Sequence, residues 1–164
     1  MNSKKLFIWC FLFVSVIGTL LHFVYEWSGN NSIVRLFAPW NESTWEHMKL
    51  LFFPMLALVL FLFFKLPEQS PIPVALSFGT LVGLALIPIL FYTYTGVLGF
   101  SVMAIDIAIF YISVLGAFLI GWFLKDNREL ANRRGLLLTC LVILAILFFI
   151  FNYYPPGIGL FQEP

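Results

Sequence analysis

The stretch LFIWCFLFVSVIGTLLHFVY, residues 6–25, decides the fold class of this chain. It contains no Asp, Glu, Lys or Arg, and a helix of this length, rising about 1.5 Å per residue, crosses the roughly 30 Å hydrocarbon core of a bilayer. Lys4 and Lys5 precede it, and no small-residue cleavage pattern separates it from the polar loop that follows. We therefore predict a retained membrane-spanning helix, with a cleaved signal peptide as the alternative.

Similar apolar stretches recur along the rest of the chain. Hydrophobic residues make up 62% of the 164 residues and charged residues 10%, which is typical of a polytopic helical membrane protein and excludes a soluble core. The sequence predicts an all-α bundle, a single transmembrane domain over residues 1–164, with helices at about 6–25, 44–65, 72–94, 98–124 and 136–153. An outer loop, 27–43, and an outer tail, 154–164, complete it. The net charge of +1 gives no electrostatic case for binding nucleic acid.

The distribution of Lys and Arg predicts how the chain sits in its membrane. With five spans, the N-terminus and the second and fourth connections share one side. That side holds seven cations: Lys4, Lys5, Lys65, Lys125, Arg128, Arg133 and Arg134. The other side holds only Arg35 and Lys49. Cytoplasmic loops carry the excess of Lys and Arg, so we predict a multi-pass protein of the cell (inner) membrane with a cytoplasmic N-terminus.

Polar residues that are costly in a bilayer are concentrated at the predicted outer ends of the helices. They are His22, Glu26, Glu42, Glu46, His47 and Asp106. His22 lies one turn deeper than Glu26 on the same helix face. Asp106 falls about seven residues into the fourth predicted helix, roughly 10 Å below the outer surface and close to the predicted depth of His22. Ionisable residues in membrane helices mark functional sites by default, so these six form the candidate site.

Two histidines with several carboxylates are the ligand types that zinc and other divalent metals take from proteins. The ligands that we predict are His22, Glu26, His47 and Asp106. Glu42 and Glu46 are the candidates for a catalytic general base. No H-E-x-x-H pattern fixes these roles. This interpretation predicts a metal-dependent hydrolase or transferase that acts on a lipid or another amphipathic substrate of the outer leaflet.

The same residues have structural interpretations that stay open at this point. Glu46 completes an S/T-x-x-E capping box with Ser43 in one of them. His22 forms an internal ion pair with Glu26 or Asp106 in another, which would make the protein a non-enzymatic binding or structural module. A proton or ion carrier is the third function considered. It is disfavoured because the predicted inner half lacks charge and the chain shows no internal repeat.

Three further segments carry predictions about packing. Ala75, Gly79 and Gly83 recur every four residues and predict a close contact with another helix. Residues 33–37 of the outer loop predict a short interfacial helix that could cover the polar cluster. The tail is too apolar for a free terminus, so we expect it to fold back over the outer face.

The chain resembles a family of small prokaryotic integral membrane proteins of unknown function. The resemblance lies in HFVYEWSG at 22–29, in FAP at 37–39 leading to NESTWEHMK at 41–49, and in YPP at 154–156 followed by LF at 160–161. The family pattern has a small aliphatic residue where Trp40 stands and a proline where Gly159 stands. The resemblance implies a bacterial-type membrane protein whose polar signature coincides with the candidate site, and it supplies no reaction.

Overall fold

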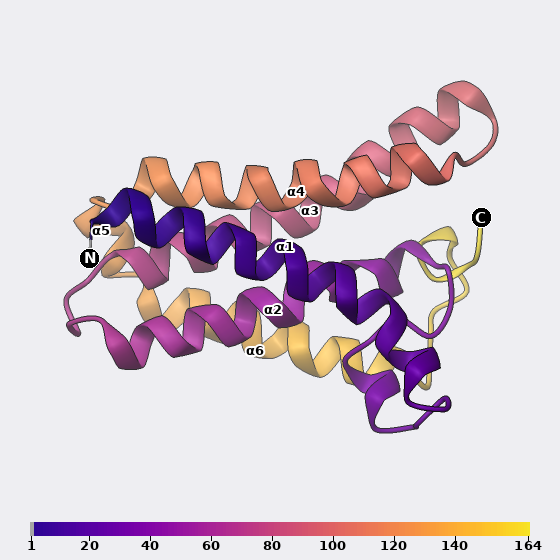
Figure 1. Cartoon of the computed structure of the whole chain (residues 1–164), viewed down its shortest axis with the longest axis horizontal. Coiled ribbons are helices and arrows are strands. Elements are labelled where there is room, and N and C mark those ends of the chain that lie inside the picture. Colours follow the sequence, from indigo (N-terminus) through magenta and orange to yellow (C-terminus); the bar gives the residue numbers. More distant parts are fainter. Residues whose placement is uncertain (1) are drawn as a thin grey trace.

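The computed structural model describes residues 2–164 as a helical bundle (Figure 1). The long helices are α1 (Ser3–Trp27), α2 (Thr44–Lys65), α3 (Ile72–Leu98), α4 (Met103–Leu124) and α6 (Arg134–Phe151). The short elements are η1 (Val34–Leu36), α5 (Arg128–Ala131) and η2 (Gly159–Phe161). Five helices in this described part are long and apolar enough to span a membrane. The predicted all-α membrane bundle is confirmed.

Local capping accounts for two of the helix bounds that differ from the expected ones. α1 begins at Ser3 because the Asn2 side chain accepts a hydrogen bond from the backbone N–H of Lys4. α3 continues to Leu98 and ends at Gly99, whose φ of 81° is the left-handed conformation that terminates helices. The Asn127 side chain accepts a hydrogen bond from the N–H of Leu130 and so caps the start of α5, which separates this single turn from α4.

Small residues bring α3 and α4 together as an antiparallel hairpin. A Cβ atom built on Gly83 would lie 2.9 Å from the Ser113 carbonyl oxygen of α4, and one built on Gly79 would collide with the Ala117 carbonyl oxygen. The predicted small-residue contact is confirmed. α1 packs on α2 and α4, and α2 also packs on α3. At the end of the bundle away from the N-terminus, the tip of the α3–α4 hairpin extends beyond the neighbouring helices (Figure 1).

Aromatic side chains hold α6 and the C-terminal tail against α2. The ring of Trp45 on α2 lies 4.5 Å from that of Phe148 on α6, and Phe148 also contacts Phe52. Phe161 of η2 returns to pack on Trp45 at 4.9 Å and on Phe151 at 5.2 Å. The expectation that the tail folds back over this end of the bundle is therefore confirmed.

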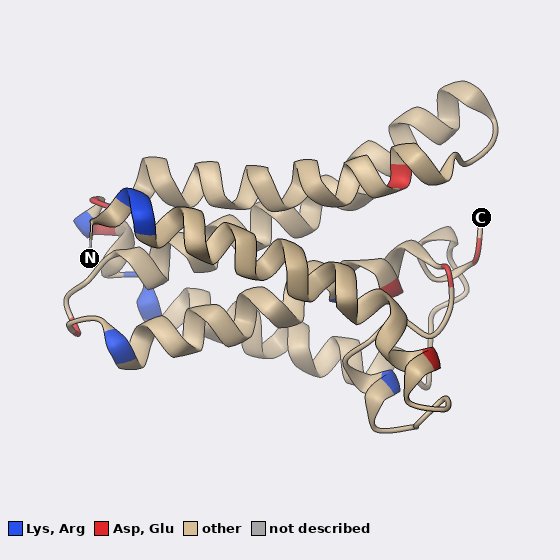
Figure 2. Cartoon of the chain, in the orientation of Figure 1, with Lys and Arg blue, Asp and Glu red and all other residues tan. Residues whose placement is uncertain are grey.

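The two ends of the bundle differ in charge (Figure 2). Lys and Arg residues gather at the end where the N-terminus lies, whereas His22, Glu42 and His47 belong to the opposite end, where α1 finishes and α2 begins. The histidines lie far from the basic end because α1 runs the length of the bundle from Ser3 to Trp27 and α2 begins where α1 finishes. The predicted orientation, with the basic end in the cytoplasm, stays a prediction.

Candidate metal site

The loop before α2 is shaped by two side-chain caps. The Asn41 side chain accepts a hydrogen bond from the Ser43 N–H at 3.0 Å, and the Ser43 hydroxyl accepts one from the Glu46 N–H at 3.4 Å. Ser43 is thus the N-cap of α2, as the S/T-x-x-E pattern predicted. The reciprocal half of the capping box was wrong, because the Ser43 N–H bonds to Asn41 and the Glu46 carboxylate turns toward Lys49. The two caps set Glu42 and His47 on either side of the helix start.

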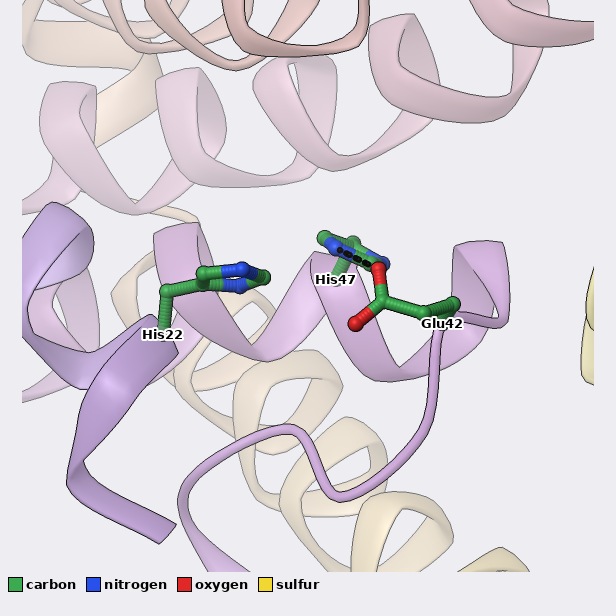
Figure 3. A group of neighbouring side chains, drawn as sticks. All are labelled: His22, Glu42 and His47. Carbon is green, nitrogen blue, oxygen red and sulfur yellow. Dashed lines mark ion pairs between the residues drawn. The ribbon is translucent and has the colours of Figure 1, made fainter. Parts of the chain in front are cut away.

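His22, Glu42 and His47 converge at this point. Each offers a ligand atom, and these atoms all lie within 4.8 Å of one another. The Nε2 atom of His47 is 3.4 Å from a carboxylate oxygen of Glu42, and the two imidazole rings have centroids 5.4 Å apart. Figure 3 shows the ring of His22 reaching from α1 toward His47, which comes from the start of α2, and Glu42, which comes from the loop before it. We call these three residues the metal triad, since the arrangement could hold a metal ion.

A backbone contact orients the imidazole of His47. Its Nδ1 atom lies 3.0 Å from the carbonyl oxygen of Ser43, which can only accept a hydrogen bond. Nδ1 therefore donates, and the lone pair of the neutral ring is on Nε2, the atom next to Glu42. Such a contact is the usual outer support of a metal-bound histidine. The Nδ1 atom of His22 is buried and has no hydrogen-bond partner among the described residues.

A cavity of about 120 Å³ adjoins the triad. Its lining residues are His22, Phe23, Tyr25, Glu26, Pro39, Trp40, Asn41 and Glu42. The side chain of Glu42 is 67% exposed and that of His47 is 30% exposed, so solvent reaches the triad. Glu26, a predicted ligand, lines this cavity but does not belong to the group of converging ligand atoms. The site thus combines three ligand side chains with open space for a further ligand.

Glu46, a predicted general base, belongs to a second cluster, the Lys49 network of Arg35, Glu46, Lys49 and Asn152. The fully buried Lys49 ammonium donates to Glu46 at 2.6 Å, to the Arg35 carbonyl at 3.0 Å and to the Asn152 side chain at 3.1 Å. An ammonium group has three N–H donors, and all three find an acceptor here. The Glu46 carboxylate is committed to this buried ion pair.

Arg35 links the Lys49 network to the outer loop. Its guanidinium donates to the Asn152 carbonyl oxygen at 2.8 Å and stacks 3.8 Å above the Trp40 ring. Lys49 and Asn152 were not predicted as functional residues. The sequence signal for Lys49 was its i, i+3 spacing from Glu46 at the start of an apolar run. Asn152 gave no comparable signal, because its partner is 103 positions away.

Asp106, a predicted ligand, contacts α3 at the α3–α4 turn. Its carboxylate accepts a hydrogen bond from the Tyr94 hydroxyl, which in turn accepts one from the Val102 N–H at 3.0 Å. Asp106 stands in the first turn of α4, where a negative charge is favourable beside the helix N-terminus. These contacts give Asp106 a role in closing the hairpin, and the structure does not bring it into the metal triad.

Asp106 therefore supplies a test that separates the hairpin from the metal triad. We expect Asp106→Asn to lower the stability of the protein by about 1 kcal/mol, because it weakens one partly buried hydrogen bond, and Tyr94→Phe to lower it by about 1–2 kcal/mol, because it removes two. Metal content should not change. Thermal melts in detergent and elemental analysis of the same samples measure the two effects. Loss of metal in folded Asp106→Asn would instead return this carboxylate to the ligand set.

Comparison with known proteins places the chain in a family but not in a functional class. No curated protein and no solved structure gives a significant match. The sequence profile of a family of unknown function, DUF6512, matches residues 1–164. Because this match covers the whole chain, the triad, the cavity and the Lys49 network all lie inside the family domain. The chain belongs to the family of unknown function DUF6512.

Proposed function

We propose that the protein binds a divalent metal ion at His22, Glu42 and His47 and uses it to hydrolyse or transfer a group of a lipid or another amphipathic substrate. The convergence of the three ligand atoms within 4.8 Å carries this proposal. Zinc sites with two histidines and one carboxylate keep an open position for water or substrate when they are catalytic. The cavity beside the triad provides room for that further ligand.

Each part of the site has a task in this proposal. A divalent metal would supply Lewis acidity and a water acidic enough to attack at neutral pH. Ser43 holds the His47 ring with Nε2 available for coordination. The exposed Glu42 connects the triad to solvent, so a proton released there passes to water. This assignment makes Glu42 a ligand, and it leaves Glu46 with its buried partner Lys49.

The location of the triad supports an amphipathic substrate. His22 is five residues from the end of α1, and His47 is in the first turns of α2, so both lie near the ends of helices that are able to span a membrane. Headgroups of lipids lie at this level, where aromatic residues such as Trp40 are enriched. With the proposed cytoplasmic N-terminus, the substrate would enter from the outer leaflet.

A structural module is the second candidate, and the Lys49 network favours it. A buried ammonium with three acceptors ties the outer loop, α2 and the end of α6 together. In this proposal the polar residues fix the arrangement of helices and no reaction takes place. The two candidates differ in whether the triad holds a metal.

Metal content tests the proposed function. We expect close to one zinc or other divalent transition metal ion per wild-type chain, measured by elemental analysis of protein purified in detergent without chelator or polyhistidine tag. His22→Ala and His47→Ala should lose the metal and still fold, because two ligands hold zinc far more weakly than three. Glu68→Ala, a substitution of an exposed acid at the opposite end, is the control and should keep the metal.

The result that contradicts the metal site is equally definite. Wild-type protein that remains metal-free after incubation with excess zinc, or folded histidine variants that keep the metal, would overturn the ligand set.

If wild-type protein binds the metal, the loaded protein is assayed against fluorogenic ester and phosphodiester lipids. Turnover that is lost with Glu42→Gln and retained with Glu68→Ala would support hydrolysis, and no turnover of any lipid by loaded protein would contradict the proposed reaction while the metal site stands.

A further inference from the structure

The lining of the cavity has a distinct chemical composition. Three of the lining side chains are aromatic, Phe23, Tyr25 and Trp40, and two are carboxylates, Glu26 and Glu42. The set of lining residues includes neither Lys nor Arg. Aromatic faces and carboxylates both attract organic cations, and cages of this type bind quaternary ammonium groups. The cavity is therefore suited to a positively charged group.

Glu26 is the carboxylate that remains for such a group. Glu42 is paired with His47 and belongs to the metal triad. Glu26 lines the cavity, and none of the ion pairs found within residues 2–164 uses it. A carboxylate on the wall of an aromatic cavity, beside but outside a ligand group, provides charge for a bound cation without competing for the metal.

The neighbouring cations of the protein are engaged elsewhere. Lys49 is fully buried with all three donors used. Arg35 donates to the Asn152 carbonyl oxygen and covers one face of Trp40, and the Trp27 ring stacks on Phe23, so a ligand would contact Tyr25 and the remaining surfaces of these two rings. The cavity lining itself thus carries two carboxylates and no Lys or Arg, while the Arg35 guanidinium is held on the Trp40 ring.

The size of the cavity limits what can enter. A volume of about 120 Å³ is comparable with that of protein cavities that hold one small organic molecule. This is room for a headgroup fragment and far too little for an acyl chain. The hydrophobic part of an amphipathic molecule would have to remain in the bilayer.

We propose that the cavity binds the organic ammonium group of a zwitterionic amphipathic substrate, with Glu26 as its counter-ion and the aromatic side chains as its walls. The inference rests on the proposed function, because the metal triad next to the cavity would engage the adjoining phosphate or ester of the same headgroup. It narrows the substrate class to molecules of the choline or ethanolamine type. Glu26 is a specificity residue in this assignment.

Choline chloride is the probe that tests the cavity separately from the metal. Binding to wild-type protein in a maltoside detergent is measured by calorimetry, beside 3,3-dimethylbutanol, a neutral molecule of the same shape. We expect choline to bind and the neutral analogue to bind at least about tenfold more weakly. Glu26→Gln should weaken choline binding by about tenfold, since it removes the counter-ion and keeps the shape. Glu163→Gln, an exposed acid in the tail, should leave it unchanged.

The outcomes distinguish this inference from the proposed function. Equal binding of choline and the neutral analogue, or undiminished binding by folded Glu26→Gln, would overturn the inference. His47→Ala removes a metal ligand that does not line the cavity, so choline binding by this variant should persist. Choline binding by a wild-type protein that takes up no metal would sustain the cavity and refute the metal site. Metal binding without choline binding would sustain the metal site and refute the cation-binding cavity.

Discussion

Replacing Lys49 by Met is expected to destabilise the protein by about 3–5 kcal/mol, the largest effect of any single substitution considered for this chain. The Lys49 side chain is fully buried, and its ammonium lies 2.6 Å from a Glu46 carboxylate that is itself 2% exposed. Met fills a similar volume but leaves the carboxylate without its cation. It also leaves the Arg35 carbonyl and the Asn152 side chain without their donor. Thermal melts in detergent measure the loss.

Two further variants show whether the cause is the unpaired charge. Lys49→Met combined with Glu46→Gln removes both charges, so the double variant should be markedly more stable than the sum of the two single losses predicts. Lys65→Met, at the exposed far end of the same helix, should melt close to wild type. If Lys49→Met and Lys65→Met have the same melting temperature, the buried Lys49–Glu46 pair contributes little to stability. The structural candidate then loses its main support.

Replacing Gly79 by Ala is expected to cost about 1–3 kcal/mol, although alanine is the better helix former. The new methyl group would collide with the carbonyl oxygen of Ala117, which belongs to the backbone of α4 and cannot rotate away. The α3–α4 hairpin would have to separate. The substitution should lower the melting temperature, and Gly79→Leu should lower it further.

The control for Gly79 lies in the same helix. A Cβ atom at Gly96 of α3 would have no atom within 4 Å, so Gly96→Ala should be neutral or should stabilise the protein by up to about 1 kcal/mol. Stability changes of opposite sign for Gly79→Ala and Gly96→Ala would show that close helix contact, and not helix propensity, decides the effect at Gly79. Equal effects at the two positions would contradict the close contact with α4.

The fold could be predicted from the sequence because length and hydropathy are local properties. Each span is visible in the sequence as an apolar stretch, and only its first and last turns depend on caps such as Asn2 or Gly99. The close helix contact at Gly79 could also be predicted from the sequence, since small residues every four positions share one helix face. The α5 turn was not expected, because a single turn leaves no hydrophobic period to detect.

The candidate site was only partly predictable, because helix rotation and loop shape decide which side chains meet. His22 and His47 were predicted as ligands, and the structure brings both into the triad. Asp106 has a depth close to that of His22 in a one-dimensional projection, yet its carboxylate bonds to Tyr94. The approach of Glu42 depends on the caps at Asn41 and Ser43, which fix a loop whose course no periodicity encodes.

The caps that open α2 also determine where the chain tolerates changes in length. Successive helical residues turn by about 100°, so one residue inserted between Thr44 and Glu46 would carry His47 away from Glu42 and Lys49 away from the Arg35 carbonyl and the Asn152 side chain. The interval from Glu42 to Lys49 should therefore admit neither insertion nor deletion. Gly29 and Asn30, exposed and with positive φ in the turn that follows α1, lie outside this constraint. Members of this family are expected to differ in length after Gly29 and to keep a constant spacing at the start of α2.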